Sequence, residues 1–272
     1  MVEGDDEMKI RVTLAGITIE LDVADGRLSE LLSGRWKGFI TAEMPSISLT
    51  VTSEEMSEGR QSERTDDMTF DGRLFSSNIR LSECTADFKT KKGKIILAGT
   101  EAEIWSSMER FITGLFSILL IEKNMLLMHA AALQRDGKAY VFSGPPDSGK
   151  TTVAEKDMRN LLCDEAVVLK STESGLMTIP TMFSGNYPAK ISQEMPLGNI
   201  YFIRHGSGLK AERLPVAESF YNIILNSFAF MLFGKGSAYV FSALMRKVPY
   251  FSSFPCFALE SRKEDRIGEM IS

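Results

Sequence analysis

The chain has 272 residues, long enough for one large domain or two smaller ones, each with a hydrophobic core. Hydrophobic residues make up 44 % and charged residues 25 %; the formal charge is −5 and no basic stripe is present, which excludes a general nucleic-acid binder. Cys84, Cys163 and Cys256 lack metal-ligand spacing, and this sparse, odd set indicates a reducing compartment without a disulfide framework.

The expected location is cytoplasmic, with no membrane contact. The first residues, MVEGDDEMK, are acidic rather than basic and apolar, so they do not resemble a signal peptide. The longest apolar run, "FSILLI" at 116–121, is too short to cross a bilayer.

The N-terminal part predicts strands. Residues 8–23 alternate apolar and polar side chains around Ala15-Gly16, which indicates a hairpin, and residues 46–52 and 93–99 alternate similarly. The polar stretch 53–72 predicts a mobile loop. We therefore expect a β-rich N-terminal domain over residues 1–99, which either supports the core or recognises a peptide by edge pairing.

The hydrophobic period changes at residue 100. From Thr100 to about Asn124 apolar residues recur at three- and four-residue steps, which predicts an amphipathic helix that starts at Thr100, Glu101 and Glu103. Its apolar face fits core packing better than partner binding.

Two apolar strands follow, at 126–133 and 138–144, around a hairpin turn at Asp136-Gly137. The second strand runs into "SGPPDSGKTT", and a helix is expected from Lys150 to about Arg159. Further strands are predicted at 161–170, 176–180 and 198–206, helices at 215–233 and 236–247, and a closing strand at 248–261 that Pro255 interrupts.

The segment 144–151 fits the phosphate-binding pattern G-x-x-x-x-G-K-S/T. In such a loop backbone N–H groups at a helix N-terminus surround a polyphosphate, the lysine reaches its terminal phosphates, and the next hydroxyl ligates magnesium. The residues expected to contact the nucleotide are Gly144, Pro145, Pro146, Asp147, Ser148, Gly149, Lys150, Thr151 and Thr152.

Asp147 stands where many such loops carry a third glycine. Aspartate tolerates positive φ, so the loop is expected to keep its bend. A carboxylate repels a polyphosphate unless a cation lies between them, so we expect weakened nucleotide affinity. The alternative is a relic loop that no longer holds nucleotide.

Asp164 and Glu165 end the strand that follows the loop's helix. Neighbouring residues of a strand point to opposite faces, so one carboxylate can hold the metal or its water shell and the other can accept a proton. A solvated acidic turn is the alternative. His129, on the strand before the loop, fits either a core or an active-site histidine. His205, near a strand end, is a weaker active-site candidate, and Arg204 beside it fits a surface cation equally well.

The segment from "LLMHAAAL" to "LLCDEAVVL" resembles HPr kinase/phosphorylase and its HPr-kinase-like relatives, whose nucleotide core is shared with ATP-dependent phosphoenolpyruvate carboxykinase. The resemblance covers about residues 125–260. It implies a phosphate-loop nucleotide-binding domain at residues 100–272. Together with the β-rich region at residues 1–99, whose strands match no family, this gives a mixed α+β and α/β protein.

The resemblance also implies roles. Lys150 would hold phosphates, Thr151 and Asp164 would serve magnesium, Glu165 would be the general base, and His129 would be the active-site histidine. Glu165 stands where the true HPr kinases have aspartate, and Asn186 where the family has a metal-binding glutamate.

We therefore expect an ATP- and Mg²⁺-dependent kinase that phosphorylates a hydroxyl, plausibly a serine, of a protein or peptide, with homo-oligomers allowed. Asp147 and Asn186 motivate an alternative, a nucleotide-binding pseudokinase or scaffold that docks a partner protein or precursor peptide. A carboxykinase-type enzyme ranks third, because the basic and metal-binding residues that it would need are missing near the loop.

Overall fold

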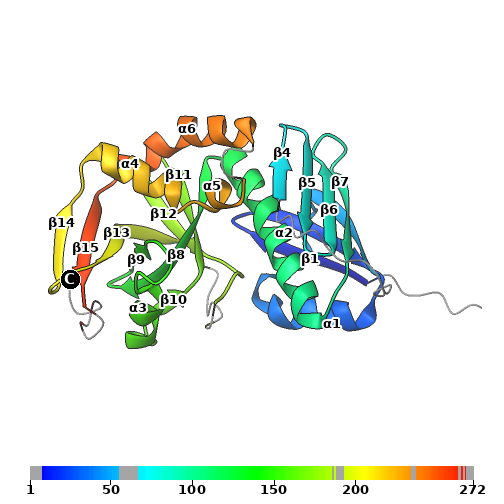
Figure 1. Cartoon of the computed structure of the whole chain (residues 1–272), viewed down its shortest axis with the longest axis horizontal. Helices are drawn as coiled ribbons and strands as arrows, with labels where there is room; N and C mark the ends of the chain where they lie inside the picture. Colours follow the sequence, from blue (N-terminus) through cyan, green and yellow to red (C-terminus); the bar gives the residue numbers. More distant parts are fainter. Residues whose placement is uncertain are drawn as a thin grey trace, which may run out of the picture. The chain divides into compact units, whose positions relative to one another are not determined.

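The structure is a computed structural model that describes residues 8–54, 67–185, 187, 193–233, 237–262, 265 and 267. Over these residues the protein is mixed α/β, with two mostly antiparallel sheets and six α-helices (Figure 1). The chain forms two compact units. The first comprises residues 1–119 and 232–241, and the second comprises residues 120–231 and 242–272. The sequence predicts a domain boundary at residues 99–100, before the long helix that begins at Glu101. In the structure most of that helix belongs to the first unit.

The first unit is built on a seven-stranded sheet with the order β1-β2-β3-β7-β6-β5-β4. Strand β3 is parallel to β2 and β7, and the other pairs are antiparallel. Its strands are β1 (Met8–Leu14), β2 (Ile17–Val23), β3 (Ile47–Ser53), β4 (Asp67–Phe70), β5 (Leu74–Ile79), β6 (Ser82–Asp87) and β7 (Lys92–Leu97).

The alternation of apolar and polar residues in the sequence explains most strands of this sheet. Buried and more exposed residues alternate along β1, and β1 and β2 meet at a turn where Ala15 and Gly16 both have positive φ, as the hairpin prediction requires. The expected strands at 46–52 and 93–99 are confirmed as β3 and β7. Of the predicted loop 53–72, residues 67–70 form β4 instead, because Met68 and Phe70 alternate into the core; residues 55–66 lie outside the described part.

Two helices belong to this unit, α1 (Gly26–Arg35), followed by the short 3₁₀ helix η1 (Lys37–Phe39), and all but the last turn of α2 (Glu101–Glu122). At the start of α2, Thr100 and Glu103 form a reciprocal capping box, as predicted. By length and composition α2 could cross a membrane, but 67 % of its most apolar window is buried inside the protein, which is equally typical of a core helix.

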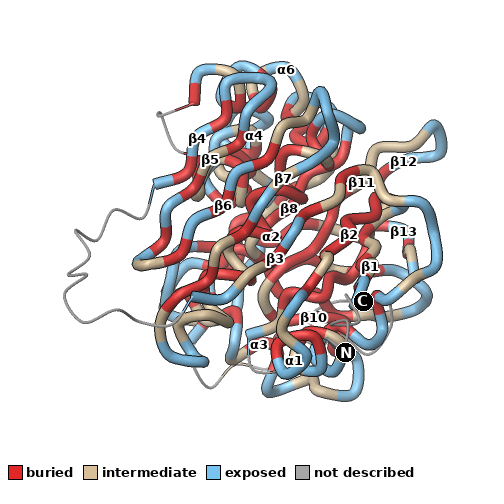
Figure 2. Tube along the Cα trace, turned by 90° about the vertical axis from the view of Figure 1, so that its right-hand side faces the viewer, coloured by how far each residue is buried: buried red, intermediate tan, exposed pale blue. Residues whose placement is uncertain are grey.

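The second unit is built on eight strands, most of them antiparallel. They are β8 (Met125–Arg135), β9 (Lys138–Ser143), β10 (Leu161–Cys163), β11 (Ala166–Thr172), β12 (Gly175–Pro180), β13 (Met195–His205), β14 (Lys210–Arg213) and β15 (Cys256–Ser261). Pairing runs from β8 through β11, β12, β13 and β9 back to β8, so these strands form a closed cycle. Figure 2 shows the buried residues concentrated along the strands, β8 and β11 among them.

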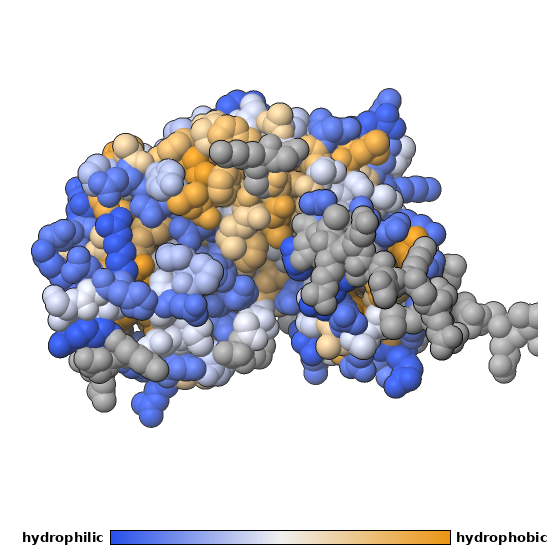
Figure 3. All heavy atoms as spheres, viewed as in Figure 1, coloured by the Kyte–Doolittle hydropathy of each residue, from blue (hydrophilic) through white to orange (hydrophobic). Residues whose placement is uncertain are grey.

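Helices α3 (Lys150–Lys156) and α4 (Val216–Leu225) belong to this unit. Helices α5 (Phe228–Phe233) and α6 (Ala238–Ser252) each contain residues assigned to both units. Figure 3 shows hydrophobic residues on the face near α4 and α5, where Val216, Leu225 and Met231 are exposed.

Several predicted boundaries are wrong. The helix expected to reach Arg159 ends at Lys156, and the helix predicted at 215–233 breaks at Asn226 and Ser227. There the amide of His129 donates to the carbonyl of Asn226, so pairing with the edge of β8 overrides helix propensity. Of the closing strand expected at 248–261, the first part continues α6, whose buried side chains keep helical spacing through Val248 and Phe251.

Candidate functional site

The glycine loop lies at the carboxyl end of β9, between Ser143 and Lys150. Strand β13 is parallel to β9 and to β15, so the carboxyl ends of three neighbouring strands meet at one edge. Ligands of α/β proteins commonly bind at such an edge. The fold therefore places the loop beside the ends of β13, with Arg204 and His205, and of β15, with Ser261.

A hydrophobic cluster anchors the two ends of the glycine loop. Phe142, the residue before Ser143, is fully buried and stacks on Tyr201 of β13, with 5.3 Å between ring centroids. Val153 and Ala154 of α3 and Ile203 belong to the same buried cluster. Because this cluster joins β9, β13 and α3, both ends of the loop are anchored in the core.

The loop keeps a bent backbone. Asp147 has φ 62°, which confirms that an aspartate can take the conformation of the missing glycine, and Gly149 has φ 109°. At Gly144 a Cβ would lie 2.7 Å from Ser148 Oγ and 3.1 Å from the carbonyl oxygen of Ile203, so only glycine fits against β13 there. Ser148 Oγ is itself buried and has no hydrogen-bond partner within the described residues.

Lys150, the first residue of α3, is 7 % exposed and turns back onto the loop. Its Nζ donates hydrogen bonds to the carbonyl oxygens of Gly144, at 2.8 Å, and Pro145, at 2.9 Å. Burial lowers the pKa of the ammonium group, and the carboxylates of Glu165 and Asp147 act in the opposite direction. The lysine thus places a buried positive charge beside the loop, with two carboxylates near it.

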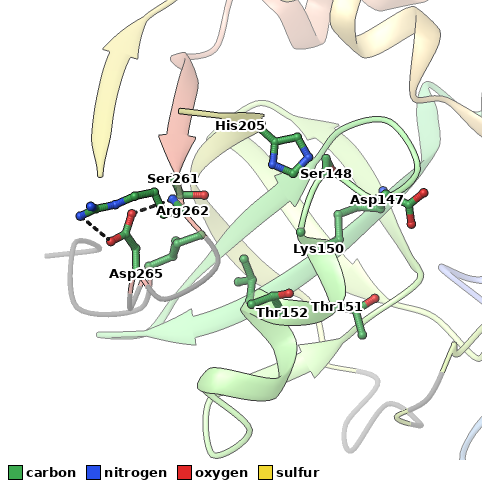
Figure 4. A pocket seen from close by; sticks show the side chains of 12 residues that line it. Asp147, Ser148, Lys150, Thr151, Thr152, His205, Ser261, Arg262 and Asp265 are labelled. Atoms are coloured by element: carbon green, nitrogen blue, oxygen red, sulfur yellow. Dashed lines mark hydrogen bonds and ion pairs between the residues drawn. The ribbon is translucent and has the colours of Figure 1, made fainter. Parts of the chain in front are cut away.

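A cavity of about 330 Å³ opens over the loop and the start of α3 (Figure 4). Within the described residues no side chain caps the N-terminus of α3. The first amides of a helix have no intrahelical acceptor, so their N–H groups can donate hydrogen bonds to an anion here. The cavity is lined by Asp147, Ser148, Gly149, Lys150, Thr151, Thr152, Val153, His205, Ser261, Arg262, Asp265 and Ile267.

Asp164 and Glu165 lie at a break rather than within one strand. Strands β10 and β11 pair with successive parts of β8, and the two acidic residues form the irregular step between them. Asp164 is buried, and its two carboxylate oxygens accept the amide hydrogens of Gly185, at 3.1 Å, and Tyr187, at 3.0 Å. Asp164 therefore fixes the loop after β12, while Glu165 keeps an accessible carboxylate, with 38 % of its side chain exposed.

His129 pairs with Glu165. Its Nδ1 lies 3.0 Å from the carbonyl oxygen of Glu165 and 3.2 Å from the carboxylate oxygen Oε1. A carbonyl oxygen only accepts hydrogen bonds, so Nδ1 carries the hydrogen that both of these Glu165 oxygens face. Ser143 Oγ donates to the carbonyl oxygen of His129 at 2.7 Å, which ties β8 to the residue before the loop.

Sequence reasoning missed the far wall of the cavity. His205, which the sequence ranked below His129 as a catalytic candidate, lines it as an exposed residue, and Ser261, Arg262 and Asp265 were given no role. Arg204 lines a second cavity of about 330 Å³, with Pro145, Pro146 and Asn222 among its walls. Arg204, His205 and Ser261 lie at the ends of strands, which was the available signal in the sequence. Only the parallel pairing of β9, β13 and β15 shows that these strand ends lie beside the glycine loop.

The described residues offer few protein ligands for the expected magnesium ion. Asn186 lies outside the described residues, and over the part of the chain that is described no group of three or more His, Cys, Asp or Glu residues could hold a metal ion by itself. Thr151, an exposed residue of the cavity wall, is the hydroxyl nearest in sequence to Lys150. A divalent cation would therefore depend on phosphate oxygens for several of its ligands, as magnesium sites with nucleotides usually do.

No protein-family model matches this sequence, and a comparison with curated proteins finds no match either.

Proposed function

We propose that the protein is an ATP- and Mg²⁺-dependent kinase of the HPr-kinase-like type that phosphorylates a hydroxyl, such as that of a serine, of a protein or peptide. One observation carries the proposal: a glycine loop with positive φ at Asp147 and Gly149 lies at the end of a buried strand, and the buried Nζ of Lys150 donates hydrogen bonds to two of its carbonyl oxygens. Loop amides, a lysine and a nearby carboxylate are the parts that phosphoryl transfer requires.

The phosphate-binding part comprises the loop and the first turn of α3. Gly144, Pro145, Pro146, Ser148 and Gly149 set the path of the backbone, and Thr152 continues the cavity wall. The helix has only seven residues, so the local amides, rather than a long helix dipole, would provide most of the attraction for phosphate. Lys150 lies beside the loop with its Nζ bonded to two loop carbonyls, and Thr151 would hold magnesium, which neutralises developing charge on the transferred phosphoryl group when bound.

Glu165 is proposed to accept the proton of the acceptor hydroxyl. Its carboxylate is accessible, and His129 Nδ1 lies within hydrogen-bond distance, so the histidine orients it. Asp164 has less freedom for the metal role implied by the family resemblance, because Gly185 and Tyr187 donate to its two oxygens. We assign it to positioning the loop after β12.

Calorimetric titration with ATP and Mg²⁺ tests the proposal. The parent protein should bind, and Lys150→Ala should weaken binding by roughly 100-fold or more, because it removes a buried charge beside the phosphates. The matched control is Lys138→Ala, an exposed lysine at the start of β9, which should bind as the parent does. If the parent protein binds no ATP, the proposal fails.

A turnover assay tests the second step. Glu165→Gln keeps the shape of the side chain and removes the base, so ATP turnover should fall by about 10²–10⁴-fold while ATP affinity stays within a few-fold. Turnover in Glu165→Gln equal to that of the parent would exclude Glu165 as the base.

The second candidate is a nucleotide-binding scaffold without phosphotransfer, which docks a partner protein or peptide. The donation of two amides to Asp164 favours it, because the carboxylate expected to serve magnesium is engaged elsewhere. This alternative requires ATP binding in the parent protein without measurable turnover, and equal partner binding by the parent and Glu165→Gln.

A further inference from the structure

The proposed kinase mechanism gives no role to the carboxylate of Asp147 in the glycine loop. Its φ of 62° requires a residue that tolerates the left-handed region, but glycine or asparagine meets that requirement without a charge. The conformation therefore accounts for the absence of a larger side chain and not for the carboxylate.

The carboxylate does not stabilise the loop as other loop aspartates of this chain do. Asp25, Asp71 and Asp87 each accept two backbone amide hydrogens, at distances of 2.8–3.2 Å. Within the described part of the chain, no hydrogen bond reaches the side chain of Asp147. The same is true of Asp136, the other aspartate at positive φ, which lies exposed in the β8–β9 turn.

What distinguishes Asp147 from Asp136 is its place. Asp147 lines the cavity together with Lys150 and Thr151, whereas Asp136 does not. In Figure 4 its carboxylate and the hydroxyl of Thr151 lie on the side of the loop away from Arg262 and Asp265. The charge of Asp147 is close enough to Lys150 to act on its ammonium group, so it also acts on an anion held beside that lysine.

A polyphosphate in this loop would therefore meet a negative charge within the loop itself. Lys150 offers limited compensation, because two loop carbonyls already accept hydrogen bonds from its Nζ. A divalent cation on the phosphates reverses the sign of the interaction, because the carboxylate then faces a positive charge, directly or through a water of the metal's shell.

We propose that Asp147 is a specificity residue that makes the loop bind a nucleoside triphosphate only as its divalent-cation complex and reject the metal-free polyphosphate. The inference rests on the proposed nucleotide site and adds a selection step to it. It gives the loop aspartate a function that glycine or asparagine could not supply.

Binding, without any activity assay, tests this inference. ATP and inorganic pyrophosphate are titrated into the parent protein, Asp147→Asn and Asp147→Gly, once with Mg²⁺ and once with a chelator. The parent should bind the Mg²⁺ form on the order of 100-fold more tightly than the metal-free form. In both variants this ratio should fall by about tenfold or more, chiefly because affinity for the metal-free ligands increases. Asp136→Asn is the matched control, and it should keep the ratio of the parent.

The outcomes separate the two proposals. If the parent binds Mg²⁺–ATP but the ratio is unchanged in Asp147→Asn and Asp147→Gly, the selection role is wrong and the nucleotide site stands. Equal affinity of the parent for both forms leads to the same conclusion. If neither the parent nor the variants bind ATP in any form, the nucleotide site fails and the inference fails with it.

Discussion

In the described part of the chain, aspartate carboxylates accept backbone hydrogen bonds in turns of the first unit but not in the glycine loop of the second unit. In the first unit, Asp25, Asp71 and Asp87 each accept two amide hydrogens within three residues of themselves. In the glycine loop, Asp147 receives no hydrogen bond within the described residues, and Ser148 Oγ is buried without a partner.

The contrast concerns the turn carboxylates and not the buried hydroxyls, because Ser77 Oγ and Ser107 Oγ of the first unit are also buried without a partner among the described residues. A carboxylate whose oxygens accept local amides has its energetic role within the fold, whereas an unengaged carboxylate needs another explanation. Asp164 shows that the division does not simply follow the units, because it lies in the second unit and accepts two amides.

The largest effect should come from removing an aromatic ring from each core. Phe75→Ala in the first unit and Phe142→Ala in the second each delete a fully buried side chain and should lower the free energy of unfolding by about 3–5 kcal/mol. Only Phe142→Ala should also weaken ATP binding, because Phe142 stacks on Tyr201 under the loop. Denaturant unfolding followed by ATP titration checks both effects.

ATP titrations should be run under conditions in which both variants are still folded. Far-ultraviolet circular dichroism of each variant checks this. Equal loss of ATP affinity in the two folded variants would mean that the first unit also shapes the site, and the contrast between the units would fail.

Local patterns predicted elements well wherever the period was long or the turn chemistry explicit. The β1–β2 hairpin at Ala15-Gly16, the capping box at Thr100, and the strand–loop–helix around Gly144 depend on neighbours in the sequence, and all are present. The polar strands β5 and β6 and the charged strand β14 were missed, because their hydrophobic alternation is weak and pairing with neighbours defines them.

The site was predictable only in part, for the same reason. The glycine loop is a local motif, but the break between β10 and β11 depends on how both pair with β8, so Asp164 and Glu165 were placed within one strand. The pairing of His129 with Glu165 joins residues 36 positions apart, and the cavity wall at His205 and Ser261 requires parallel strands that no local pattern specifies.

A smaller effect should follow from Asp164→Asn, which tests whether this residue serves the fold. An asparagine has one oxygen for two amides, so either Gly185 or Tyr187 loses its acceptor, and stability should fall by about 1–3 kcal/mol. Amide hydrogen exchange at Gly185 and Tyr187 should become faster.

Asp157→Asn is the control, because it changes a carboxylate whose observed partner is the side chain of Asn160, and its effect should stay within about 0.5 kcal/mol. If Asp164→Asn is as stable as the parent but loses Mg²⁺-dependent ATP binding, Asp164 is a metal residue and not a positioning residue.

Asp25→Ala should have a smaller effect still. Asp25 caps α1 by accepting from the amides of Arg27 and Leu28, and loss of an N-cap typically costs about 1 kcal/mol. Asp25→Asn retains an acceptor oxygen and should recover most of the stability. By contrast Asp147→Asn, which removes no hydrogen bond of the described residues, should leave thermal unfolding unchanged; a loss equal to that of Asp25→Ala would mean that the carboxylate of Asp147 stabilises the loop.

The smallest effect concerns the pH dependence of a surface pair in the first unit. Hydrogen bonds from Arg73, at 2.7 Å for the shortest, lower the pKa of Asp87 to about 2, and the amides of Lys89 and Thr90 act in the same direction. Because the folded-state pKa lies below the unfolded value of about 3.9, the pair stabilises the fold above that pH, and its contribution disappears as the pH falls towards 2.

Arg73→Ala should therefore raise the pKa of Asp87 towards its ordinary value without reaching it, because both amides remain. A carbon-detected NMR titration of the carboxyl group measures this, and stability near pH 7 should change little because the pair is exposed to solvent. A pKa that does not move in Arg73→Ala would show that the two amides alone hold the carboxylate. The first unit would then stabilise Asp87 entirely through its backbone, which would sharpen the contrast with the glycine loop.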